Sequence, residues 1–197
     1  MKKIRTFFVS GIILLLLTIV PIQAHATTYY TYNNHVITWN VENIWYYVDS
    51  SVSSYYTYLI LRGTDNWVHT GVGYNRLYPL TRTTNISLSA VDFYSYGLQP
   101  NTLAITTVYK RVNGQAVAVN PNNENWLFAE IAFDENQMNT YEERLRLVGV
   151  VHELGHAWGL AHNPDTHSVM YWNASDMDSS VTGVTSIDNA TFNYLYP

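Results

Sequence analysis

The hydrophobic pattern of the chain changes its period several times, and each period predicts one kind of element. Short runs rich in aromatic and β-branched residues favour strands, because these side chains suit the pleated, half-buried surface of a sheet. Such runs occupy residues 36–39, 44–48, 86–93, 103–112, 116–119 and 126–133. Asn113-Gly114 is a strong tight-turn dipeptide, so we expect the fourth and fifth runs to pair as a hairpin.

Two segments carry apolar residues at helical spacing. In residues 50–69 the stripe starts after Ser50 or Ser51, the candidate N-caps, and Gly71 follows its end. The residues of this stripe, which we interpret as core, are Val52, Tyr55, Tyr56, Leu59, Ile60 and Trp67. A short helix is expected over residues 186–196, with an inward face made of Ile187, Ala190, Tyr194 and Leu195.

A third helix is expected to begin at a capping box and to end at a glycine. In Thr140-Tyr141-Glu142-Glu143 the Thr140 side chain can bond the Glu143 amide while the Glu143 side chain reaches back. Leu145, Val148, Val151 and Leu154 then form an apolar stripe that predicts burial against the sheet, and Gly159 predicts the end. Since the chain has no internal repeat and no linker, we expect one mixed α/β domain.

The first 26 residues have the pattern of a secretory signal peptide. Lys2, Lys3 and Arg5 precede an apolar run over residues 7–20, and Ala24-His25-Ala26 is a small-x-small cleavage site. A permanent membrane anchor is the alternative, but spanning a bilayer takes about 20 apolar residues, more than this run holds. We therefore expect residues 1–26 to be removed and residues 27–197 to be secreted as an extracellular domain without a stable membrane anchor.

Composition excludes several functions. Hydrophobic residues make up 47% of the 197 and charged residues 13%, which predicts a globular fold and not a disordered chain. The net charge is −5, and removing the three basic residues of the N-terminus leaves 7 basic against 15 acidic residues, or −8. That balance argues against binding nucleic acid. The chain has no cysteine, which excludes disulfides and a thiolate nucleophile, and we expect a monomer.

The chemistry is concentrated between His152 and His162, where the sequence reads H-E-x-x-H-x-x-G-x-x-H. On a helix, positions i and i+4 share a face, so His152 and His156 can present two imidazoles to one ion. Gly159 lets the chain leave the helix at low steric cost, so that His162 can supply the third ligand of a catalytic zinc. Glu153, beside the first ligand, can then act on the water of that zinc.

An ordinary helix whose histidines pack or face water is the alternative explanation of this pattern. Five fixed letters, three of them the uncommon histidine, make a chance match in a chain of this length an event on the order of 1 in 10⁵. A zinc site is therefore the better interpretation.

The full pattern, followed by Met170 in Ser168-Val169-Met170-Tyr171, resembles the metzincin clan of zinc endopeptidases and, within it, compact secreted bacterial members of the matrixins. The similarity extends to Trp67, to Asn101-Thr102-Leu103-Ala104, to residues 132–135 and to residues 194–197. The resemblance implies an α/β (α+β) metzincin fold. Its parts would be a twisted, mixed five-stranded sheet, a backing helix, the active-site helix and a small C-terminal part with the Met-turn and a terminal helix.

The resemblance also implies roles for individual residues. Met170 would form the hydrophobic floor beneath the three histidines. An edge strand of Leu103, Ala104 and Ile105 would pair with the substrate backbone, and Tyr171 would begin the wall of the pocket for the side chain that follows the scissile bond. Asp134 and Glu135 resemble a calcium-binding acidic turn, so calcium is a second candidate ion beside the one catalytic zinc.

Some features depart from the matrixin pattern. Without cysteine there is no cysteine switch to hold the enzyme latent. His35 and His69 are isolated, so we interpret them as surface or core residues and not as a second zinc site. Trp172 stands where matrixins usually have proline. Tyr171 follows Met170 directly, so we expect no fifth ligand, and His167 is likewise not counted as one.

These residues predict a secreted zinc-dependent endopeptidase that hydrolyses extended protein or peptide substrates. Zinc lowers the pKa of its water and polarises the scissile carbonyl, and Glu153 serves as general base and then as general acid. Two alternatives remain at this point: a catalytically silent binding protein that uses some of the 17 tyrosines, and a zinc hydrolase acting on other bonds. An intact Glu153 argues against the first, because a structural zinc site needs no base.

Overall fold

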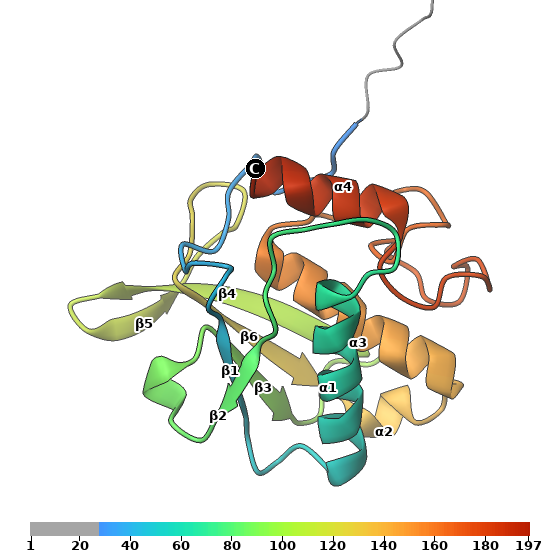
Figure 1. Ribbon diagram of the computed structural model, residues 1–197. Helices are drawn as coiled ribbons and strands as arrows, with labels where there is room; N and C mark the ends of the chain where they lie inside the picture. Colours follow the sequence, from blue (N-terminus) through green and yellow to red (C-terminus); the bar gives the residue numbers. More distant parts are fainter. Residues whose placement is uncertain (1–27) are drawn as a thin grey trace, which may run out of the picture.

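The computed structural model describes residues 28–197, and they form a six-stranded sheet with helices packed on it (Figure 1). The strands are β1 (Trp45–Val48), β2 (Thr81–Thr83), β3 (Val91–Ser95), β4 (Ala104–Val112), β5 (Gln115–Ala118) and β6 (Phe128–Phe133). Their order in the sheet is β2-β1-β3-β6-β4-β5. Strands β2, β1, β3 and β6 are parallel to one another, and β4 runs antiparallel to both β6 and β5, so the sheet is mixed. The signal peptide expected at residues 1–26 lies outside the described residues.

The helices are α1 (Ser54–Val68), α2 (Glu135–Met138), α3 (Glu143–Trp158) and α4 (Ser186–Leu195). Helix α1 packs along α3, and α3 contacts β4 and β6 (Figure 1). The two helices approach closely at Gly63, where an added Cβ would lie 2.7 Å from Cγ1 of Val150. The indole Nε1 of Trp67 donates to the carbonyl of Val151 at 2.9 Å. Helix α3 is thus fixed between the sheet and α1.

The mixed α/β class expected from the sequence is confirmed, but the sheet has six strands and not five. Two of the runs assigned as strands behave differently. Around Ile37 there is only an isolated bridge to Trp126, and Ile86–Leu88 is a 3₁₀ turn that Asn85 caps through Ser87, so β3 starts only at Val91. Strand β2 was not expected, because its polar, exposed residues carry no strand pattern.

The expected starts of α1 and α3 were wrong in detail, whereas the expected start of α4 at Ser186 and the expected end of α3 were right. Helix α1 is capped by Ser53, whose hydroxyl accepts from the Tyr56 amide, because Ser51 is held in a turn by Asp49. The capping box at Thr140 does not form, since its hydroxyl donates to the Gln137 carbonyl at the end of α2. Gly159, with φ of 106°, ends α3 in the left-handed conformation.

Helix α4 has a different inner face from the one expected. Its buried residues are Asp188, Asn189, Thr191 and Phe192, while Tyr194 is 48% exposed. The helical period placed the apolar residues inward, but Asp188 is inside because it bonds both the helix start and the segment before Met170. Among residues 28–197 no helix is long and apolar enough to cross a membrane.

Candidate metal centre

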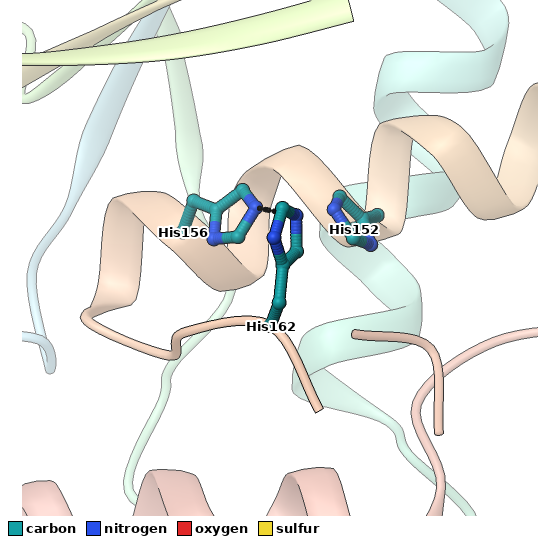
Figure 2. A group of neighbouring side chains, drawn as sticks. All are labelled: His152, His156 and His162. Carbon is teal, nitrogen blue, oxygen red and sulfur yellow. Dashed lines mark hydrogen bonds between the residues drawn. The ribbon is translucent and has the colours of Figure 1, made fainter. Parts of the chain in front are cut away.

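Three histidines meet at the C-terminal end of α3 (Figure 2). His152 and His156 lie one turn apart on the helix, and His162 comes from the loop after Gly159. Their candidate ligand atoms all lie within 4.8 Å of one another. In the described part of the chain no other set of three His, Cys, Asp or Glu residues is placed in this way.

Hydrogen bonds leave the Nε2 atoms of the two helical histidines free to bind a metal. The Nδ1 atom of His152 lies 2.7 Å from the Val169 carbonyl, and that of His156 lies 2.8 Å from the Leu160 carbonyl. Because a carbonyl only accepts, each Nδ1 carries the proton and each Nε2 keeps its lone pair.

The spacing of the nitrogens suits zinc. The Nε2 atoms of His156 and His162 are 3.2 Å apart (Figure 2). Two nitrogens at the usual distance from a tetrahedral zinc lie roughly 3.3 Å apart. Three neutral imidazoles with this spacing, and no competing acid in the cluster, fit the ion that the sequence predicts.

Partial desolvation of the imidazoles favours the neutral form of these histidines, although His162 is exposed at the surface. Desolvation lowers the pKa of His152, and it lowers the pKa of His156 well below its ordinary value. The pKa of His162 falls to about 4, through desolvation and then the neighbouring His152. Since a ligating imidazole must be unprotonated, the triad is ready to bind metal at neutral pH.

The loop after Gly159, which carries His162, is held by the beginning of the described chain. The Tyr32 amide donates to the Gly159 carbonyl at 3.2 Å, and the Ala161 amide donates to the Tyr30 carbonyl at 2.9 Å. The Tyr32 hydroxyl lies 2.9 Å from Nδ1 of His156. Sequence reasoning assigned no role to this tyrosine-rich segment, since no motif joins it to residues 120 positions or so further along the chain.

Met170 and Asp188 support the site from below. Met170 is 1% exposed, and its sulfur packs so closely on Gly155 of α3 that a Cβ there would collide with it. The carboxylate of Asp188 accepts from the Ser168 hydroxyl and, at 2.9 Å, from the Val169 amide. Since the Val169 carbonyl in turn receives the Nδ1 proton of His152, α4 fixes the orientation of that ligand. Sequence reasoning missed Asp188, although Thr185 and Asp188 have the spacing of a capping box.

Glu153 lies beside the triad and is only 7% exposed. Burial raises the pKa of its carboxyl to about 7, and a hydrogen bond from Thr106 opposes that shift. The Thr106 hydroxyl is 2.7 Å from Oε2 of Glu153 and 3.0 Å from its backbone carbonyl. Sequence reasoning did not single out Thr106 among the residues of its strand.

A cavity of about 290 Å³ adjoins the triad. His152, Glu153 and His162 line one side of it, and Leu103, Ala104 and Tyr171 lie in its other walls together with Trp172. Ile105 does not line the cavity, and its side chain is 44% exposed. A larger cavity of about 600 Å³ is lined by residues from Val68 to Pro79. It contains one histidine, His69, which is paired with Asp65. The histidine cluster and Glu153 therefore adjoin the smaller of these two cavities.

The acidic turn makes protein contacts of its own. Asp134 caps α2 through the Gln137 amide, and its other oxygen accepts from the Leu98 amide at 3.0 Å. One oxygen of Glu135 accepts from the Ser53 amide at 2.9 Å. These bonds give both carboxylates a structural role, and calcium binding there stays a prediction.

The other histidines of residues 28–197 lie away from the triad. His35 bonds the Asn125 side chain, His69 pairs with Asp65, and His167 pairs with Asp165. None of these three belongs to the histidine cluster.

Comparison with protein families agrees with the interpretation of this cluster as a metal site. Residues 87–197, more than half of the chain, match the family model described as Matrixin. The matched segment contains the three histidines, Glu153 and Met170. No curated protein matches the chain with significant similarity.

Proposed function

The chain belongs to the matrixin family and is a zinc metalloendopeptidase that acts on protein or peptide substrates, and we propose that it is a secreted one with Glu153 as its general base. In this proposal residues 27–197 are the secreted catalytic domain, a monomer without a membrane anchor. The signal-peptide pattern of residues 1–26 supports export.

The convergence of the three imidazoles beside the Glu153 carboxylate is the observation that carries the proposal. His152, His156 and His162 would hold the zinc through their Nε2 atoms. Zinc, when bound, supplies Lewis acidity that activates water and polarises the scissile carbonyl. Glu153 accepts a proton from the attacking water at a carboxylate oxygen and delivers it to the nitrogen of the leaving amine.

The substrate would lie along the outer edge of β4. The Leu103 carbonyl accepts from Asp134 and the Tyr109 carbonyl accepts from Leu127, so the odd-numbered residues of this strand bond inward to the rest of the sheet. In an antiparallel strand the even-numbered residues then face outward. Ala104 and Thr106 therefore offer free N–H and C=O groups for a peptide that adds as a further strand.

The edge is short because β5 covers the rest of it. The Val108 carbonyl already accepts from the Val119 amide at 2.9 Å, and Tyr109–Val112 pair with β5. Of the three residues expected from the resemblance, only Ala104 turns its backbone groups outward, while Leu103 and Tyr171 contribute to the adjoining pocket. That pocket would receive the side chain after the scissile bond.

Incubating the purified protein with a mixed peptide library, with and without a chelator, tests the proposal. We expect cleavage within peptides, its loss on chelation and its recovery when zinc is added back. Cleavage that persists in excess chelator would rule out the triad as the catalytic centre. Mapping the cleaved bonds would also show which side chain the 290 Å³ pocket prefers.

A further inference from the structure

Thr106 joins the substrate edge to the helix that carries the site. Its side chain reaches from β4 to α3, across 47 positions of sequence, and its hydroxyl lies 2.7 Å from Oε2 of Glu153. Its backbone groups lie in the plane of the sheet and face the free edge. A single residue thus touches both the carboxylate and the place where a substrate backbone would pair.

The hydroxyl is a donor in this contact. Both groups within reach, the backbone carbonyl at 3.0 Å and the carboxylate at 2.7 Å, are oxygens that accept hydrogen bonds. The hydroxyl has one proton, and a bond to a charged acceptor is the stronger of the two. The hydroxyl therefore donates its proton to Oε2 of Glu153 while the carboxylate is ionised.

This contact removes the main freedom of the carboxylate. The terminal torsion of a glutamate is broad and only weakly restrained by its own stereochemistry. Within residues 28–197, Oε2 has the Thr106 hydroxyl as partner, whereas Oε1 has no hydrogen-bond partner from the protein. Holding Oε2 leaves Oε1 as the oxygen available to take up a proton.

We propose that Thr106 is a positioning residue for catalysis, whose hydroxyl orients the Glu153 carboxylate toward the attacking water. The proposal rests on the proposed role of Glu153 as general base. Thr106 itself transfers no proton and binds no metal.

Three substitutions test it. Thr106→Val keeps the shape of the side chain without the hydroxyl, and Thr106→Ser keeps the hydroxyl. Thr107→Val is the matched control, because the next residue of a strand points to the other face of the sheet. We expect Thr106→Val to lower kcat roughly 10- to 100-fold, the effect of losing one hydrogen bond to a charged group, with KM and zinc affinity unchanged. Thr106→Ser and Thr107→Val should keep kcat within about threefold of the parent value.

A double-mutant cycle separates positioning from a purely structural tie between β4 and α3. In a Glu153→Gln background, measured by single-turnover cleavage, Thr106→Val should cause no further loss, because the group it positions is gone. If Thr106→Val lowers the melting temperature by several degrees, the comparison of Thr106→Ala with Thr106→Ser answers the same question.

Two results would overturn the proposal: parental kcat in Thr106→Val, or the same loss of kcat in both Glu153 backgrounds. Either of them leaves the role of Glu153 intact. Full activity of Glu153→Gln alone would instead refute the proposed base, so the two failures are distinguishable.

Discussion

Single residues at this site act through short chains of contacts. Asp188 of α4 accepts from the Val169 amide, and the Val169 carbonyl accepts from Nδ1 of His152, so a residue far along the sequence orients a histidine of the triad. Second contacts of this kind set the tautomer and direction of a ligating imidazole. The geometry of the triad therefore depends on residues outside it.

Asp92 is a buried carboxyl outside the site and gives a prediction about stability. It is 4% exposed, accepts from the Ser89 hydroxyl, and burial raises its pKa from 3.8 to about 6. Between these values the folded protein binds more protons than the unfolded chain, so stability falls as pH rises through about 6.

Asp92→Asn should remove this dependence, because asparagine keeps an acceptor for Ser89 and carries no charge. Between pH 4 and pH 8 the parent should lose about 2 to 3 kcal/mol of unfolding free energy through this carboxyl, and the variant should not show that loss. Urea unfolding at both pH values measures the change, with the exposed Asp176→Asn as control. Equal pH profiles for parent and Asp92→Asn would show that ionisation of the Asp92 carboxyl does not destabilise the folded protein.

At the scale of elements, the β4–β5 hairpin limits the length of the proposed substrate edge (Figure 1). Lys110 near its base pairs with Glu124 at 2.6 Å, which helps to hold it against the sheet. If the 290 Å³ pocket takes the residue after the scissile bond, the residues before that bond run along Thr106 toward Val108 and meet the hairpin. Strand pairing on that side must stop there.

Peptides extended one residue at a time on the N-terminal side of the cleaved bond test this limit. We expect kcat/KM to rise over about three residues and then level off, since two residues of β4 offer free backbone groups and paired strands alternate. The same series extended on the C-terminal side is the control. A steady gain over six or more N-terminal residues would mean that the hairpin does not end the cleft.

The elements differ in how far the sequence predicts them. Helix α3, with its end at Gly159 and the histidines on one face, follows from local spacing alone, and so does the β4–β5 hairpin from Asn113-Gly114. The inner face of α4 does not, because hydrophobic period cannot anticipate that a buried Asp188 will find partners in a distant turn. The contacts of Thr106 and Tyr32 are equally non-local, and they depend on a fold that no short pattern encodes.

For the whole molecule, both ends of the described chain close around the C-terminal end of α3. Tyr29 stacks on Tyr194 with ring centroids 4.5 Å apart, and the Tyr196 hydroxyl donates to the Trp158 carbonyl at 2.7 Å. The chain has no cysteine, so these contacts and the core replace disulfides in holding the site together. The N-terminal end thus holds the loop after Gly159, and the C-terminal end holds the last residue of α3.

The proposed function requires that the chain bind zinc through three histidines and use Glu153 only for proton transfer. Zinc content and peptide cleavage measured on one preparation of Glu153→Ala test it most directly. We expect one zinc per chain, as in the parent, with kcat/KM reduced by about 10² to 10⁴ or more. Cleavage at the parental rate by the zinc-loaded variant would contradict it.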